Sequence, residues 1–247
     1  MDSVASSSSS PPKLTARRAA PTVAIVVPVF VEPEIDSQLG RLVALAPDEL
    51  IVTEAGERAT SERLRSFAAN GDAAGNVRIV SAARGRASQM NAGAVVAQSE
   101  ILFFVHADTV LPANALSLVR DAIARGAVWG RFDVRLSGAA PAFRVIERAM
   151  NWRSALTGIA TGDQTLFVRR DVFDMLGGFA PIALMEDIEF SRRLKSVARP
   201  FRIRMPVITS SRRWERDGIV RTVLTMWMLR ALYALGASPR FLARLYR

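Results

Sequence analysis

Four apolar runs in the first half of the chain are the feature that most restricts its fold. They lie at 22–30, 48–56, 76–82 and 100–108, and stretches of helical spacing near 36–46, 59–70 and 86–98 separate them. Runs that are continuously apolar, rather than alternating, are typical of strands buried on both faces of a parallel sheet. The sequence therefore predicts an α/β fold with a mostly parallel, Rossmann-like sheet and flanking helices.

The second half of the chain predicts a mixed continuation of this sheet. Residues 127–136 alternate as a strand with one exposed face would. Further strands are predicted at 161–170 and 201–210, and helices at 141–156 and 186–198. A chain of 247 residues suits one large domain, here 22–215, with appendages.

The appendages differ in composition. Residues 1–21 contain a serine run and prolines with little to bury, which predicts a disordered leader without the apolar segment of a secretory signal. Residues 216–247 form a basic, apolar C-terminal segment. Its stretch 218–236 is interrupted by Arg221 and Arg230, which argues against a membrane span. A helix docked on the domain and one lying on a membrane surface are both open.

Charge and rare residues restrict the chemistry. The net charge is +10, and the segment from Arg199 onward contains eleven arginines but only two acids. Such a field suits anionic lipid or a phosphorylated substrate, whereas the scarcity of interleaved aromatic residues argues against nucleic acid. With no cysteine and one histidine, carboxylates must supply most acid, base or metal chemistry.

Polar residues stand where the fourth predicted strand leaves the sheet. Ligands of parallel sheets collect beyond the carboxyl ends of the strands. His106 and Asp108 leave this strand on the same side, because strand side chains repeat every second residue. Asp108 is a suitable ligand for Mg²⁺ or Mn²⁺ bound to a diphosphate. A turn that caps the next helix is the alternative.

A second candidate site lies at the start of the helix near 86–98. Arg84 and Arg86 precede a helix whose early residues include Gln89 and Asn91. Two guanidinium groups and a helix N-terminus together can bind an anion, so Arg84, Arg86, Gln89 and Asn91 are candidates for binding the nucleotide part of a substrate. An ordinary solvated helix start is the alternative.

Two acids, Glu186 and Asp187, open the helix predicted at 186–198. The helix dipole alone favours acids there. The functional interpretation is that one of them accepts a proton from a substrate hydroxyl group.

Two further segments carry weaker signals. Asp163 and Gln164 follow Gly162 in what could equally be a turn. Arg213 and Trp214 could form a phosphate clamp with an aromatic wall, or a basic exposed loop.

Seven segments in order carry a resemblance to a known family. They are "VAIVVPVF", "DELIVTEAG", "GRASQMNAGA", "ILFFVHADTVLP", "TGDQTLFVRRDVFDMLGGF", "LMEDIEFSRRL" and "SSRRWERDGIVRTVL". From Thr22 to about Tyr246 the chain resembles the family 2 glycosyltransferases, and within them the bacterial branch associated with radical-SAM/selenodomain proteins.

This resemblance implies a GT-A fold that binds a nucleotide sugar and a divalent cation, Mg²⁺ or Mn²⁺. It implies that Pro28 lies next to the nucleotide and that Glu54 stands where most relatives have an aspartate contacting the base or ribose. It places His106 and Asp108 at the two ends of the DxD-type motif, with Asp108 as the metal ligand. It makes Asp187 the catalytic base, with Glu186 beside it.

The departures from the family pattern concern three positions. Glu54 is one methylene longer than aspartate, and His106 replaces a carboxylate. Arg213 and Trp214 match the end of a Gln-x-x-Arg-Trp motif, but Ser210 takes the glutamine position. That replacement argues against a processive polymerase.

The sequence thus predicts a metal-dependent, inverting glycosyltransferase that moves a sugar from a nucleotide diphosphate to a hydroxyl acceptor, with a lipid-like acceptor hinted at by the C-terminal helix. We expect it in the cytoplasm, with peripheral association with the inner face of the cell membrane left open. One alternative is a sugar-phosphate nucleotidyltransferase, although the segment after the first strand lacks a glycine-rich phosphate loop. The other is a catalytically inactive protein that binds nucleotide sugar or membrane.

Overall fold

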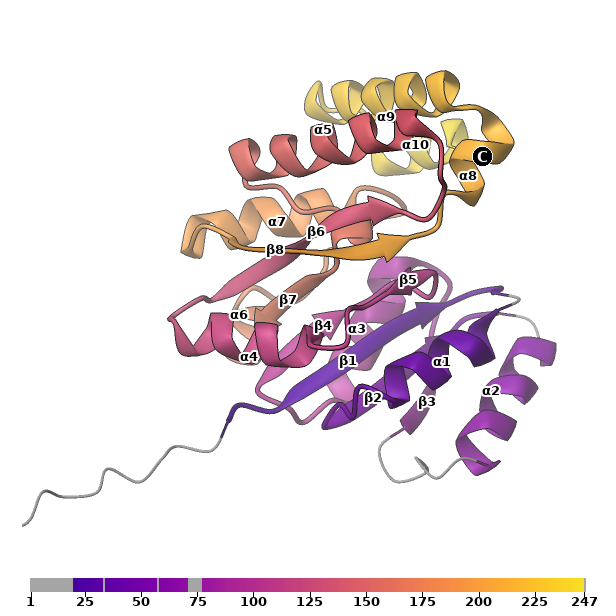
Figure 1. Ribbon diagram of the computed structural model, residues 1–247, viewed down its shortest axis with the longest axis vertical. Coiled ribbons are helices and arrows are strands. Elements are labelled where there is room, and N and C mark those ends of the chain that lie inside the picture. The colour runs from indigo at the N-terminus through magenta and orange to yellow at the C-terminus, as the bar shows by residue number, and fades with distance from the viewer. Residues whose placement is uncertain (1–19, 33, 57, 71–76, 247) are drawn as a thin grey trace, which may run out of the picture.

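The computed structural model describes residues 20–32, 34–56, 58–70 and 77–246 and contains one eight-stranded sheet with helices on both sides (Figure 1). The strands are β1 (Val23–Val29), β2 (Glu49–Glu54), β3 (Val77–Ser81), β4 (Ile101–Phe104), β5 (Thr109–Val110), β6 (Trp129–Leu136), β7 (Leu166–Arg169) and β8 (Phe201–Thr209). The helices are α1 (Ile35–Val43), α2 (Arg58–Asn70), α3 (Arg86–Val96), α4 (Ala115–Ala124), α5 (Pro141–Thr157), α6 (Arg170–Met175), α7 (Glu186–Val197), α8 (Arg212–Asp217), α9 (Ile219–Ala234) and α10 (Pro239–Leu245). The predicted leader lies, apart from its last two residues, outside the described residues.

The first half of the sheet confirms the predicted α/β architecture. In the order β3-β2-β1-β4-β7-β6-β8-β5, the first four strands are parallel to one another. Glu54, at the end of β2, lies opposite both Val29 of β1 and Ser81 of β3. The carboxyl ends of these strands therefore share one rim.

The second half of the sheet is mixed, and two predictions about it are wrong. The strand predicted at 161–170 begins only at Leu166, because Gly162–Gln164 form a 3-10 turn called η1. Strand β6 has no exposed face, since only Arg135 of its residues is exposed. Buried Arg131 donates to Asp133 Oδ1 over 2.8 Å, so an ion pair fills positions whose polarity suggested solvent.

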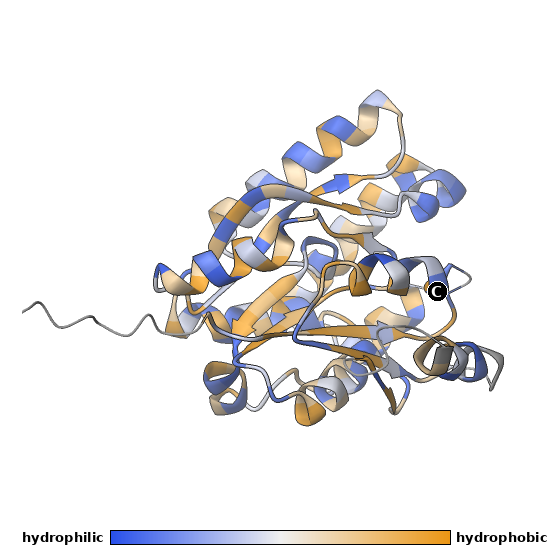
Figure 2. Cartoon of the chain, turned by 60° about the horizontal axis from the view of Figure 1, so that its bottom comes forward, coloured by the Kyte–Doolittle hydropathy of each residue, from blue (hydrophilic) through white to orange (hydrophobic). Residues whose placement is uncertain are grey.

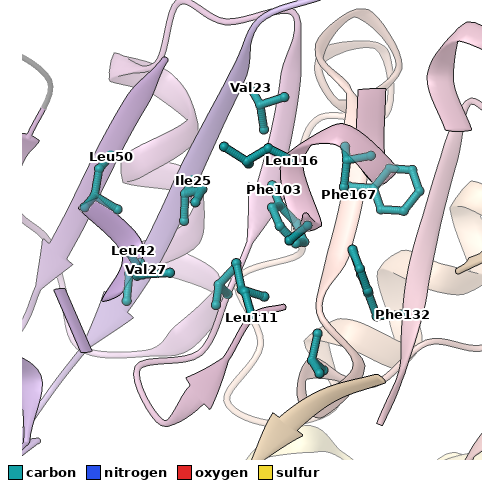
Figure 3. Close-up of a cluster of buried hydrophobic side chains, with 14 of the residues drawn as sticks. Val23, Ile25, Val27, Leu42, Leu50, Phe103, Leu111, Leu116, Phe132 and Phe167 are labelled. Carbon is teal, nitrogen blue, oxygen red and sulfur yellow. The ribbon is translucent and has the colours of Figure 1, made fainter. Parts of the chain in front are cut away.

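Two apolar clusters cover the two faces of the sheet. On one face, Figure 3 shows Leu42 of α1 and Leu116 of α4 against β1 and β4. There the rings of Phe103 and Phe132 stack with centroids 5.6 Å apart. The other cluster joins the sheet to α3, α6 and α7. In Figure 2 the central strands are mostly orange, whereas the helices around them carry both blue and orange residues, as expected of helices that cover a sheet.

The C-terminal helices pack against the domain. Leu229 of α9 and Leu242 of α10 form a small cluster with Met185 and Ile188, at the N-terminal end of α7. Arg221 is exposed, whereas Arg230 is partly buried on the inner side of α9. No helix in the described part of the chain is long and apolar enough to cross a membrane.

Candidate functional site

The rim of the parallel strands is built around the buried carboxylate of Glu54. Ser61 Oγ donates to Glu54 Oε2 over 2.6 Å, and Ser81 Oγ donates to the other carboxylate oxygen. Burial opposes the charge, but these hydrogen bonds and one from the backbone of Gly56 outweigh it and lower the pKa of Glu54. Glu54 is therefore an ionised, firmly held group next to the exit of β1.

The two amides predicted to contact the nucleotide bind backbone. Gln89 Nε2 donates to the carbonyl oxygens of Val29 over 2.6 Å and Thr53 over 2.8 Å, which joins the ends of β1 and β2. Asn91 exchanges two hydrogen bonds with the backbone of Phe179, at 2.8 and 2.9 Å. Both amides thus have clear roles in shaping the rim.

Arginines at the start of α3 face the rim. The guanidinium of Arg84 lies 4.2 Å from the ring centroid of Phe30, directly after β1. Arg86 begins α3 and is exposed to solvent on one side, although other residues crowd around its guanidinium group. Burial opposes its charge, yet Glu186, Asp163 and Asp187 together raise its pKa. Arg86 is thus the cation around which these acids gather.

His106 is packed against the turn that holds Asp163. A Cβ on Gly162 would lie 2.1 Å from His106 Cε1, so the imidazole occupies the space in front of this glycine. Burial, and then the charge of Arg86, lower the pKa of His106 to about 3. The imidazole is therefore neutral and available as a hydrogen-bonding group or ligand.

Asp108 is a partly buried member of the same group of acids. Burial raises the pKa of its carboxyl group, and the charges of Asp163 and Glu32 raise it further against the effect of Arg86. Among the described residues, no group of three side chains of the metal-binding kinds lies close enough to hold an ion alone. The donor set still fits Mg²⁺ or Mn²⁺ bound to a diphosphate, because such ions commonly take one or two carboxylates and complete their shell with phosphate and water.

Asp187 and Asp163 are brought together by the turn η1. The backbone N–H of Gly162 donates to Asp187 Oδ2 over 2.8 Å, and Asp187 is in the first turn of α7. Burial raises the pKa of Asp163, with Asp187 adding to the effect and Arg86 opposing it. Burial and the charge of Asp187 raise the pKa of Glu186 to about 7. Asp163 thus interacts with Asp108 on one side and with Asp187 on the other.

Three of the remaining candidates have structural partners. Gln164 is fully buried, and its Nε2 donates to Asn151 Oδ1 over 3.3 Å. Arg213 donates to the carbonyl oxygen of Tyr246 over 3.1 Å and lies 3.7 Å from that ring centroid. It thereby fastens α10 to α8, and Trp214 beside it is partly buried. Pro28 is partly buried in β1, where it lies opposite Thr53.

Sequence reasoning missed two arginines that face the same acids. The charges of Asp187 and Asp163 act on both Arg153, from α5, and Arg230, from α9. Arg230 had a visible signal, since it interrupts an apolar helix. Arg153 had none, because only the fold places α5 beside Asp187.

A family comparison matches most of this structure. The sequence profile described as Glycosyl transferase family 2 matches residues 24–180. The chain belongs to this family. The match ends before Glu186 and Asp187, so their roles rest on the geometry above and not on the profile.

Solved structures share the fold of this chain. A mannosyltransferase, PcManGT, from Pyrobaculum calidifontis in complex with GDP-Man and Mn²⁺ is 21% identical, with a TM-score of 0.59 over 78% of this chain and 57% of that one. Residues 1–349 of S. aureus TarS are 13% identical, with a TM-score of 0.62 over 77% of this chain and 60% of that one. TarS in complex with UDP-GlcNAc is 13% identical and has a TM-score of 0.61, over 76% of this chain and 58% of that one.

These comparisons establish the GT-A fold that the sequence predicted. The chain spans about three fifths of the length of these solved chains. Among curated proteins, no sequence matches significantly.

Proposed function

We propose that this chain transfers a sugar from a nucleotide-diphosphate donor to a hydroxyl acceptor and inverts the anomeric centre. The observation that carries this is that Asp163 interacts with both Asp108 and Asp187, which brings together three carboxylates from distant segments of a chain of this family. The solved neighbours that hold GDP-Man or UDP-GlcNAc support a nucleotide sugar as the donor class.

The nucleotide side of the site is the rim from β1 to β4. Glu54 presents a fixed negative group near the base and ribose, and Arg84 stands over Phe30 at the end of β1. Arg86 offers positive charge to the diphosphate at the start of α3. Asp108 would hold Mg²⁺ or Mn²⁺, which when bound neutralises the diphosphate leaving group.

Asp187 is the proposed base. One carboxylate oxygen is held by the N–H of Gly162, so the group is oriented before a substrate arrives. The acceptor hydroxyl gives its proton to Asp187 as its oxygen attacks the anomeric carbon from the face opposite the diphosphate. Glu186 has a carboxyl pKa near neutrality and is the competing candidate for this role.

A lipid-like acceptor is supported by the outer face of α9. Val220, Leu224 and Trp227 are 70%, 64% and 72% exposed, although all are apolar. Exposed apolar residues beside arginines are typical of helices that lie on an anionic membrane surface. We therefore propose that the protein also attaches peripherally to a membrane.

A thermal-shift screen of nucleoside diphosphates with and without Mn²⁺ tests the proposal. We expect one nucleotide to raise the melting temperature in a metal-dependent way, because nucleotide and ion bind as a unit. In Asp108→Asn, the nucleotide should still raise the melting temperature in the absence of metal. Adding Mn²⁺ should give no further rise. Metal-independent stabilisation by every nucleotide, together with no hydrolysis of any sugar nucleotide, would exclude this function.

A further inference from the structure

The strongest unexplained feature is a pair of arginines beyond the catalytic acids. The charge of Arg230 acts on Arg153, and the charges of Asp187 and Asp163 act on both arginines. Within the described residues, neither guanidinium group donates a hydrogen bond or forms an ion pair within 4 Å. Two like charges placed together without such partners point to a ligand that the protein itself does not supply.

The free atoms of Arg153 form a recognition edge. Its Nε and Nη2 are buried and have no hydrogen-bond partner. Arg202 uses the same edge to bind both carboxylate oxygens of Asp133, over 2.8 and 2.7 Å. An oxyanion fits this edge in two-point geometry.

The charge state of the pair suits an anion. Burial and the charge of Arg230 lower the pKa of Arg153 to about 10, so Arg153 is still protonated at neutral pH. Burial also lowers the pKa of Arg230. Since a phosphate offers enough oxygen atoms for both guanidinium groups, its binding would relieve the repulsion between them.

The position of the pair separates it from the nucleotide side. Asp108 interacts with Asp163, Glu32 and Arg86, toward the rim of β1 and β4. Arg153 and Arg230 come from α5 and α9, which lie at the other end of the molecule from α1 and α2 (Figure 1). The charge of Asp187 acts on Arg86 as well as on Arg153 and Arg230, so Asp187 lies within reach of both the proposed diphosphate side and this pair.

We propose that Arg153 and Arg230 bind a phosphate group carried by the sugar acceptor, and so position its hydroxyl group beside Asp187. This rests on the proposed transfer reaction and names its acceptor class. The phosphate can belong to a lipid or to a soluble molecule, because the same guanidinium edges recognise both.

Access to the pair requires movement of the C-terminal helices. Helix α9 buries only Thr222 and Leu229, and α10 buries only Leu242. Helices with so few buried side chains open at low cost compared with the core. We therefore expect α9, which carries Arg230, to move when a ligand enters.

Calorimetric titration of the full chain with glycerol 1-phosphate tests the site, with Mn²⁺ and a saturating nucleoside diphosphate present to fill the nucleotide site. We expect binding to the wild type, and affinity lower by at least about tenfold in Arg153→Met and Arg230→Met. Arg148→Met is the matched control, because Arg148 is exposed on the same helix as Arg153. It should bind within about twofold of the wild type.

Vesicles distinguish a lipid phosphate from a soluble one. Sedimentation with phosphatidylcholine vesicles, with and without phosphatidic acid, should show retention that depends on Arg153 and Arg230 if the source is lipid. Binding of glycerol 1-phosphate without such retention indicates a soluble acceptor. If neither probe binds, or if both variants and Arg148→Met behave as the wild type, the proposal is overturned.

Two controls distinguish loss of the phosphate site from misfolding of a variant and from failure of the proposed transfer reaction. Arg153→Lys and Arg230→Lys keep the charge but lose the planar edge, and they should weaken binding by at least about threefold. They replace any methionine variant that does not fold. If no nucleotide binds, the same titration without nucleotide still decides the phosphate site, so the two failures are distinguishable.

Discussion

The backbone N–H of Gly162 donates a hydrogen bond of 2.8 Å to Oδ2 of Asp187, and His106 fills the space in front of the same glycine. Three segments far apart in the sequence therefore meet at one residue. Any side chain at position 162 must displace the imidazole, the turn η1 or both. The orientation of the proposed base depends on that contact.

Replacing Gly162 with alanine should thus impair both folding and transfer. The added Cβ would lie 2.1 Å from Cε1 and 2.4 Å from Nε2 of His106. We expect the free energy of unfolding to fall by about 1–3 kcal/mol and kcat to fall at least about tenfold. Denaturant unfolding and a transfer assay measure these effects.

Gly40→Ala is the matched control for this substitution. Gly40 lies in α1, and a Cβ there would meet nothing within 4 Å. We expect it to stabilise the protein by about 0.5–1 kcal/mol, because alanine favours a helix more than glycine does. If Gly162→Ala changes the free energy of unfolding as Gly40→Ala does, the close approach of His106 to Gly162 does not contribute to stability.

The two acids at the start of α7 should respond differently to loss of charge. Asp187→Asn keeps an oxygen for the N–H of Gly162 but removes the base, so transfer should fall by at least about 100-fold at unchanged nucleotide affinity. Glu186→Gln should lower transfer at pH 7 by less than about tenfold. The reverse pattern in steady-state kinetics would assign the base to Glu186.

The parallel half of the fold could be predicted because its strands are buried on both faces. Such strands appear in the sequence as uninterrupted apolar runs. Because the strands are parallel, the residues that follow them lie at one rim of the sheet. Strand β6 is also buried, but its Arg131 and Asp133 neutralise each other in the interior. A sequence pattern cannot distinguish that pair from two solvated residues.

The candidate site could be located from the sequence, but the partners of its residues could not. Gln89 was predicted to bind nucleotide, and the structure shows its amide holding the backbone of β1 and β2. The sequence around Arg153 did not indicate a role in the site, because its interaction with Asp187 exists only once the fold brings α5 and α7 together. Both cases involve contacts between residues more than 30 positions apart, which local spacing does not encode.

Glu186 should make stability fall as the pH rises from about 4.5 to about 7. Burial and Asp187 raise its carboxyl pKa from 4.5 to about 7 in the folded protein. Between these values the folded state holds a proton that the unfolded state has lost, so the free energy of unfolding decreases with pH. Below pH 4.5 both states are protonated and this stabilising contribution is fully present.

Glu186→Gln should remove that part of the pH dependence. Relative to the wild type, the variant should gain stability progressively from pH 4.5 to 7, by about 3 kcal/mol, and the difference should then stay constant. Urea unfolding at half-unit pH intervals measures it. A difference that is independent of pH would mean that the carboxyl pKa of Glu186 is the same in the folded and unfolded states, because Arg86 offsets the effects of burial and of Asp187.

Arg153→Met should stabilise the ligand-free protein. The guanidinium of Arg153 is charged, its Nε and Nη2 are buried without partners, and Arg230 repels it. Methionine fills similar space without an unpaired charge, so we expect the free energy of unfolding to rise by about 1–3 kcal/mol. Arg148→Met, on the exposed side of the same helix, should change it by less than about 0.5 kcal/mol. If thermal denaturation instead shows Arg153→Met to be less stable than the wild type, the attraction of Asp163 and Asp187 outweighs the burial of Arg153, and the arginine is a structural part of the acid cluster. Higher stability combined with lost activity is the pattern expected of a residue kept for binding.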